Sequence, residues 1–259
     1  MARTKQEAPI IGSFGKGIDG SISINFGVSG GPDCDPACRH HPDSLAPDGA
    51  THACYAARSE IRPDRTQLSA KLHRHQGMPP ALVLGKALLE IQRIVERGKV
   101  VPWVRLSTNG ALPMPRKVRG NKLFRSQLLA LLSYCNDHSI PCHIPTESFA
   151  KARFYRSLVG TLAVVRESIQ GGLTRLKTAT GAVSYVAGEK SQTRPERIES
   201  ARNAARARRE HTGRKTIVCP ALLNSWAGMQ DKNKLNPRAK CGACVACSTS
   251  GVDVIYPLH

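Results

Sequence analysis

Acidic and aromatic residues are both scarce in this sequence of 259 residues. There are 19 Asp and Glu residues against 38 Lys and Arg residues, which gives a formal net charge of +19 and a sequence pI of about 10.0. A surplus of this size predicts a polyanionic partner, and nucleic acid is the first candidate. Aromatic residues make up only 5% of the chain, which weighs against a broad base-stacking platform. The alternative explanation of the charge is an arginine-rich composition spread over solvated helix faces.

Long apolar runs are also missing. No stretch of about eighteen apolar residues occurs, so the sequence predicts neither a membrane span nor a membrane partner. The opening segment, MARTKQEAPIIGSFGKG, lacks the apolar core of a signal peptide. These absences predict a soluble cytoplasmic protein. In that reducing compartment, the nine cysteines are expected to serve metal binding or catalysis rather than disulfides.

Segments with the period of a β-strand alternate with segments with the period of an α-helix. This alternation predicts βαβ units and a mainly parallel sheet. The expected fold class is α/β, with a partial (βα)6 barrel over residues 1–218 and a cysteine-rich metal-binding extension over residues 219–259. The expected elements are strands at 21–28, 100–106, 140–144, 161–165, 182–187 and, last, 215–218, and helices at 79–96, 124–136, 149–158 and 195–211.

Polar residues follow several of these strands, at the end where parallel α/β proteins bind their ligands. Two acidic residues in such places, Glu147 and Glu167, are candidates for cofactor contact or proton transfer, with an ordinary salt bridge as the alternative. The polar groups are Ser107, Thr108, Asn109 and Gly110 after the strand at 100–106, Glu147 after the strand at 140–144, and Arg166, Glu167 and Ser168 after the strand at 161–165.

Four cysteines near the C-terminus have the spacing of a metal site. Cys241, Cys244 and Cys247 form a C-x-x-C-x-x-C run, and Cys219, followed by proline, is the remote fourth cysteine. Continuous runs of this kind hold three corners of a [4Fe–4S] cluster, whereas structural zinc usually takes two separated C-x-x-C knuckles. The spacing therefore favours iron–sulfur, with zinc and unligated thiols as alternatives.

Three further cysteines lie in or beside the loop after the first predicted strand. Three residues separate Cys34 from Cys38, and fifteen separate Cys38 from Cys54. Three thiolates on a four-iron cluster leave one iron open to another ligand, as in open catalytic zinc sites. A histidine of the same loop could instead complete a closed Cys₃His zinc site. The remaining pair, Cys135 and Cys142, is expected to pack in the core as small hydrophobic residues.

The segment SINFGVSGGPDCDPAC resembles the cluster loop of the radical S-adenosylmethionine (SAM) superfamily. The resemblance implies a [4Fe–4S] cluster on Cys34, Cys38 and Cys54, with SAM chelating the open iron and being cleaved reductively to a 5′-deoxyadenosyl radical. It also implies a reductant protein as partner and an auxiliary cluster on the C-terminal cysteines. The implied cofactor-binding residues are Tyr55, Ser107, Thr108, Asn109, Gly110, Glu147, Arg166 and Ser168.

The chain is also similar to phage- and plasmid-borne proteins with a cysteine trio ending in Cys-Tyr-Ala and a terminal cysteine cluster. The leading hypothesis is a radical-SAM-like enzyme that acts on a nucleic acid or nucleotide. A basic rim at the barrel mouth would attract such a substrate. One alternative is a non-enzymatic nucleic-acid-binding protein of a mobile genetic element with structural zinc or iron–sulfur sites, and the other is an iron–sulfur redox sensor. The rim residues nearest the second strand are Arg116, Lys117, Arg119 and Lys122.

Overall fold

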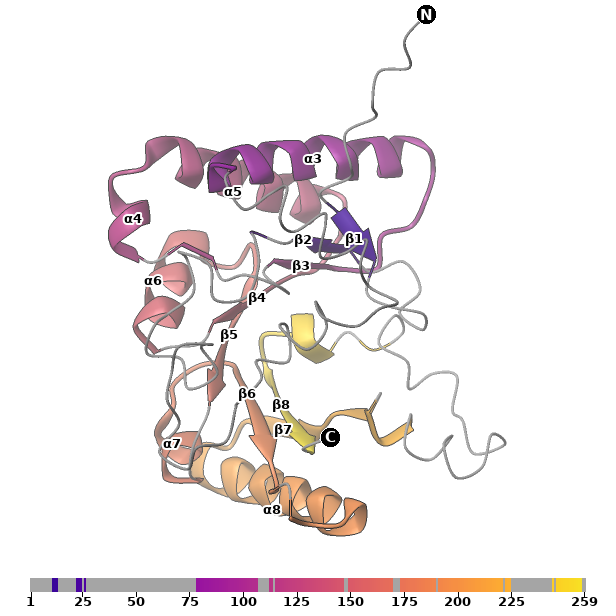
Figure 1. The fold of residues 1–259 in the computed structure, drawn as a ribbon, viewed down its shortest axis with the longest axis vertical. Coiled ribbons are helices and arrows are strands. Elements are labelled where there is room, and N and C mark those ends of the chain that lie inside the picture. Colours follow the sequence, from indigo (N-terminus) through magenta and orange to yellow (C-terminus); the bar gives the residue numbers. More distant parts are fainter. Residues whose placement is uncertain are drawn as a thin grey trace, which may run out of the picture.

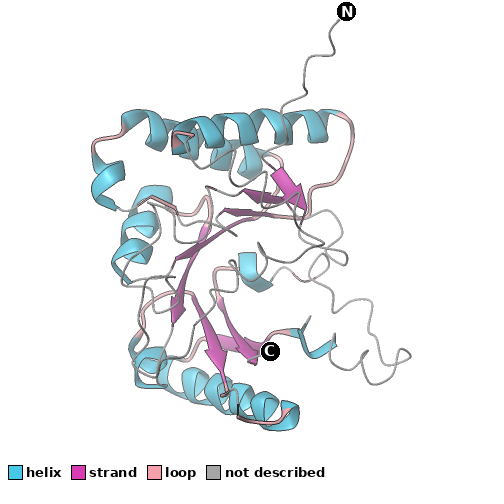
Figure 2. Cartoon of the chain, viewed as in Figure 1, coloured by secondary structure: helices cyan, strands magenta, loops and turns pink. Residues whose placement is uncertain are grey.

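An eight-stranded sheet runs through the molecule, and helices cover one of its faces (Figure 1, Figure 2). The structure is a computed structural model that describes residues 11–13, 22–24, 26, 78–106, 112–113, 115–146, 149–169, 173–189, 191–220, 222–224, 244 and 246–257. The strands are β1 (Ile11–Ser13), β2 (Ile22–Ile24), β3 (Val104–Leu106), β4 (Cys142–Thr146), β5 (Val164–Ile169), β6 (Val183–Ala187), β7 (Lys215–Val218) and β8 (Val252–Pro257).

The sheet is almost entirely parallel. Its order is β1-β2-β3-β4-β5-β6-β8-β7, and only β1 pairs antiparallel with its neighbour. The other seven strands are parallel to one another, and β2 to β6 follow each other in chain order. The predicted α/β class with a mainly parallel sheet is therefore confirmed.

The prediction that β7 is the last strand is wrong. Strand β8 follows it in the chain and enters the sheet between β6 and β7. Residues 252–257, which were expected in a separate C-terminal extension, therefore belong to the same sheet as the rest of the fold. Their apolar alternation is too short to stand out against the cysteine-rich segment that precedes it.

The helices that the sequence predicted are present, with ends shifted by one or two residues. None of the described helices has both the length and the apolar character needed to cross a bilayer. The helices are α3 (Pro80–Glu96), α4 (Pro115–Arg119), α5 (Lys122–Asp137), α6 (Phe149–Val159), α7 (Leu173–Thr178) and α8 (Arg194–Thr212), with a short 3₁₀ helix, η4 (Ala246–Ser248).

The curvature of the sheet gives it two different faces (Figure 1). Helices α3 to α8 line the outer face, and η4 lies on the inner side, which we call the concave face. Alternate strand residues such as Val104, Leu106 and Ile144 pack with helices in the main apolar core. Because side chains alternate along a strand, the residues between them, such as Arg105 and His143, point to the concave face.

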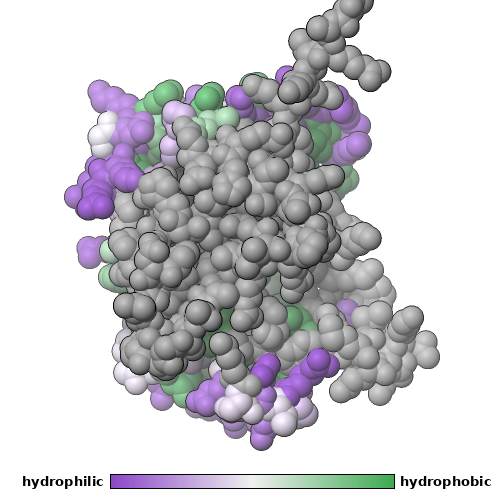
Figure 3. Space-filling model, in the orientation of Figure 1, coloured by the Kyte–Doolittle hydropathy of each residue, from purple (hydrophilic) through white to green (hydrophobic). Residues whose placement is uncertain are grey.

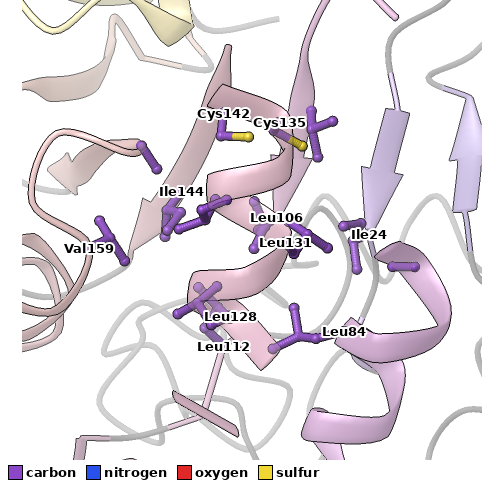
Figure 4. Close-up of a cluster of buried hydrophobic side chains, with 14 of the residues drawn as sticks. Ile24, Leu84, Leu106, Leu112, Leu128, Leu131, Cys135, Cys142, Ile144 and Val159 are labelled. Atoms are coloured by element: carbon purple, nitrogen blue, oxygen red, sulfur yellow. The ribbon is translucent and has the colours of Figure 1, made fainter. Parts of the chain in front are cut away.

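The main core lies between the sheet and helices α3 and α5 (Figure 4). It includes Cys135 on α5 and Cys142 on β4, which are 0% and 3% exposed. A hydrogen bond with Cys135, followed by burial, raises the pKa of the Cys142 thiol well above its usual range, so this thiol stays protonated at neutral pH. The prediction that both cysteines pack as small hydrophobic residues is confirmed.

A buried ion pair fixes β8 against the last helix. The Arg208 side chain on α8 donates from Nε to Asp253 Oδ2 at 2.9 Å, and both side chains are 0% exposed. Asp253 also accepts from the backbone N–H of Val183 at 3.0 Å and from Arg214 at 3.1 Å. The inserted strand is therefore held on the helix side by charge-assisted hydrogen bonds.

Candidate functional site on the concave face

Most of the predicted ligands of the first cluster and of SAM lie outside the described residues. This holds for all members of the N-terminal trio and for the turn after β3. What the structure does describe is the strand before the trio: β2 is the first of the seven parallel strands, as expected. The predictions that lie outside the described residues are Cys34, Cys38, Cys54, Tyr55, Ser107, Thr108, Asn109, Gly110, Glu147 and Cys241.

Two of the four C-terminal cysteines pack in the same group of apolar side chains on the concave face. Cys219 directly follows β7 and is 9% exposed, and its backbone N–H donates to Ile255 O at 2.8 Å. Cys247 on η4 packs in the same apolar cluster. Cys244 is half-buried. Among the described residues, no group of three or more His, Cys, Asp or Glu side chains is placed to hold a metal ion, so the metal site stays a prediction.

A tyrosine of the same apolar cluster lies beside Cys247. The Tyr256 hydroxyl lies 3.0 Å from Cys247 Sγ, within hydrogen-bonding distance. Burial, followed by the nearby Cys247 and Cys219 thiols, raises the pKa of Tyr256 well above its usual range. The phenol therefore keeps its proton and can donate it to a sulfur, which would stabilise the thiolate form that binds metal.

Arg166 holds the segment that carries Cys247. The sequence placed Arg166 in a turn after its strand, and this prediction is wrong: β5 continues to Ile169, and the Arg166 side chain is 0% exposed. Its Nε donates to Cys247 O at 2.6 Å, and its Nη2 donates to Ala246 O at 2.6 Å and to Thr249 O at 3.0 Å. Its Nη1 donates to Val183 O at 3.1 Å.

These bonds make Arg166 the anchor of η4 on the concave face. The guanidinium satisfies backbone carbonyls that would otherwise be buried without donors. Burial lowers the pKa of Arg166, and the neighbouring Cys247 and Tyr256 oppose that shift. The predicted contact of Arg166 with SAM stays a prediction, because the described partners of this side chain are protein carbonyls.

Ser168 is also inside β5 rather than after it. It pairs in register with Ser184 on β6 and is half-buried. Glu167, between Arg166 and Ser168, alternates to the helix side and is 1% exposed. The polar residues 166–168 therefore lie within a strand and point alternately to its two faces. In the sequence, three consecutive polar residues resemble a turn, and for that reason the strand was predicted to end before them.

The sequence analysis missed two polar residues of the concave face, Arg105 and His143. They lie on neighbouring strands and pair directly in register. Each stands between two buried apolar residues of its strand, and that pattern was the available signal. His143 is 3% exposed, and Trp103 lies beside it with a ring-centroid distance of 6.4 Å.

No protein-family model matches the sequence, and a search of curated proteins found no match either. The functional assignment therefore depends on the cysteine spacing, the fold and the chemistry of the concave face.

Proposed function

We propose that this protein is a radical-SAM-like iron–sulfur enzyme with a nucleic acid or nucleotide as substrate. The observation that carries the proposal is the order of the sheet: the parallel strands β2 to β6 follow each other in chain order, and helices α3 to α8 lie on the outer face. We interpret the curved sheet as a partial (βα) barrel. In such folds, ligands bind where the strands end, and the connection after β2 carries the cysteine trio.

The proposed cofactors are two [4Fe–4S] clusters and SAM. With three protein thiolates, the first cluster would leave one iron open for SAM and supply the electron that cleaves it. At the second site, the structure describes several of the residues that would surround the cluster. Cys219 and Cys247 pack in the same apolar cluster, the Tyr256 hydroxyl lies beside Cys247 Sγ and can donate its proton to sulfur, and the Arg166 charge lies close by. Thiolates are stabilised by such donors and positive charge.

An exposed basic surface supports the nucleic-acid part of the proposal. It covers α4 and the first turn of α5, and we call it the α4–α5 patch. Its side chains are all exposed, and the sequence has no Asp or Glu from residue 101 to 136. Figure 3 shows hydrophilic residues gathered over α4, and a second hydrophilic group along α8. The patch consists of Arg116, Lys117, Arg119, Lys122 and Arg125.

The enzymatic part is tested by incubating anaerobically purified protein with dithionite and SAM. We expect 5′-deoxyadenosine from the wild type and none from Cys34→Ser. Cys135→Ser is the matched control, because Cys135 is a buried core residue, and it should retain the activity. Colourless protein with stoichiometric zinc and no 5′-deoxyadenosine would contradict the enzyme and support a nucleic-acid-binding protein with structural metal. A brown protein that does not cleave SAM would support the redox sensor.

The nucleic-acid part is tested by the salt dependence of binding to single- and double-stranded DNA and RNA. Each phosphate contact contributes about 0.7 to 0.9 to the slope of log K against log salt. Neutralising three patch residues (Arg116→Gln, Lys117→Gln, Arg119→Gln) should therefore lower the slope by about 2 to 3. The control changes Arg202 and Arg206, two exposed residues of α8, to Gln. A slope that falls only in the α8 variant would place the interface there instead.

A further inference from the structure

A buried histidine on the concave face has no hydrogen-bond partner in the part of the chain that the structure describes. Both ring nitrogens of His143 lack one among the described residues, although the side chain is only 3% exposed. A buried polar group without a partner destabilises the fold, whereas an apolar residue would fill the position without that cost. Such groups are rare in folded proteins, and binding of a ligand is one of their ordinary explanations.

The surroundings of His143 are positively charged. Arg105 on β3 pairs with His143 in register. On β5, Val164 pairs with His143, and Arg166 lies two residues after Val164 and therefore on the same face of the sheet. These are the charged groups that face His143 from the adjacent strands. Burial, then Arg105, then Arg166 lower the pKa of His143 well below its usual range, so the ring is neutral at pH 7.

The described strand residues of this face bring no carboxylate to balance the arginines. The described strand residues that alternate to the concave side include no Asp or Glu: Asp253 and Glu167 both point to the helix side. Arg166 directs four of its N–H groups to backbone carbonyls. It can therefore attract an anion through its positive charge but has few N–H groups left to donate to it. The inner surface at β3 and β4 therefore suits an anion that brings at least one full negative charge.

We propose that Arg105 and His143 bind a phosphate group of the substrate on the concave face of the sheet, with Arg166 adding positive charge from β5. A doubly charged oxyanion would balance the arginines more fully than a carboxylate does, and guanidinium and imidazolium donors match its oxygens. The anion would favour the protonated ring, so His143 gains a proton and a partner when the ligand binds. The site includes no cysteine and goes beyond the proposed function, because it names the group of the substrate that is recognised and its location.

The first test uses wild-type protein with ¹⁵N-labelled histidine, titrated with inorganic phosphate and followed by imidazole NMR signals. We expect one buried imidazole, identified by its absence in His143→Gln, to shift on titration and to take up a proton. Unchanged imidazole signals at phosphate concentrations that saturate any binding seen by calorimetry would overturn the proposal. The titration itself is carried out on wild-type protein, and the His143→Gln variant serves only to assign the imidazole signal.

The second test measures affinity by calorimetry. His143→Gln and Arg105→Met should each weaken phosphate binding by about tenfold or more, as expected for a lost charge-assisted hydrogen bond. His138→Gln, at an exposed histidine on the C-cap of α5, should bind as the wild type does. Sulfate keeps both charges between about pH 8 and pH 6, so its affinity should rise as the pH falls, and this rise should vanish in His143→Gln. Equal affinities in the wild type and His143→Gln would contradict the site.

Competition separates this site from the cofactor pocket. We expect a nucleoside 5′-monophosphate to displace inorganic phosphate, and SAM and acetate to leave it bound. Displacement by SAM would assign the pocket to the SAM carboxylate and overturn the proposal while leaving the proposed enzyme intact. Phosphate binding in a protein that cleaves no SAM would have the opposite meaning, because the site would stand and the proposed function would fall.

Discussion

Replacing Arg166 by methionine should release η4 without touching any predicted metal ligand. The substitution keeps much of the side-chain volume and removes all donors to the carbonyls of Cys247, Ala246, Thr249 and Val183. A hydrogen bond from a charged donor contributes about 1.5 to 3 kcal/mol, and bonds made by one side chain are not additive. We expect a net loss of about 3 kcal/mol in the free energy of unfolding.

The assay combines urea denaturation with a measurement of metal content. A loss of about 3 kcal/mol corresponds to a fall of about 1 M in the urea midpoint for an m-value near the upper end of the usual range. If the C-terminal cysteines hold iron as proposed, the iron content should fall as well, because the segment that carries Cys247 loses its anchor. In metal-free protein, Cys247 should react faster with iodoacetamide than it does in the wild type.

Arg156 offers a matched control on the opposite side of β5. Its side chain, on α6, donates to the carbonyls of Val165, Thr180 and Ala182, but it is only half-buried and does not touch η4. Water can replace some of these donors, so Arg156→Met should cost about 1 kcal/mol and leave the metal content unchanged. The reasoning would be refuted if Arg166→Met kept its C-terminal metal and its Cys247 reactivity, or if Arg156→Met lost the metal equally.

Three further predictions concern stability. Asp253→Asn leaves the buried charge of Arg208 without a counter-ion and should cost about 3 to 5 kcal/mol in urea denaturation. Glu199→Gln, which breaks an exposed ion pair of 3.6 Å, should cost less than about 1 kcal/mol, and equal losses would contradict the role of burial. The lowered pKa of His143 means that only the unfolded chain takes up its proton near pH 6.5, so stability should fall as the pH drops below that value, by up to about 1.4 kcal/mol per pH unit. His143→Gln should remove this part of the slope, and an unchanged acid limb in that variant would show that another group is responsible. Cys135→Ala should lower the urea midpoint and leave the metal content unchanged, whereas lost metal would mean that this core thiol is a ligand.

Local signals in the sequence were sufficient for the four long helices, α3, α5, α6 and α8, whereas the short helices α4 and α7 were not predicted. Pro195 near the start, Gly213 at the end and a stripe of small apolar residues define α8, and the structure adds a capping box between Thr193 and Glu196. Helix α3 likewise begins at its prolines and ends before Gly98. These signals depend on neighbours along the chain, and for that reason they can be read without a structure.

The site depended on contacts that span long stretches of sequence. Arg166 resembled a turn residue because its partners, the carbonyls at 246, 247 and 249, lie about 80 residues further along the chain. Strand β8 was missed for a similar reason. It contains a charged residue, Asp253, that can be buried only because Arg208, 45 residues earlier in the chain, pairs with it in the folded protein. No pattern within a short window identifies such partners. Cys219 and Cys247 pack in the same apolar cluster, and the metal site predicted from their spacing stays a prediction.

The central claim, that two separate sets of cysteines hold metal, is tested most directly by counting iron and sulfide in anaerobically purified protein. The wild type should contain about eight irons per chain, four for each cluster. The double variants Cys34→Ser/Cys38→Ser and Cys244→Ser/Cys247→Ser should each retain about four irons, with the absorption of the remaining cluster. Protein without iron in the wild type, or a full complement of iron in either double variant, would contradict the claim.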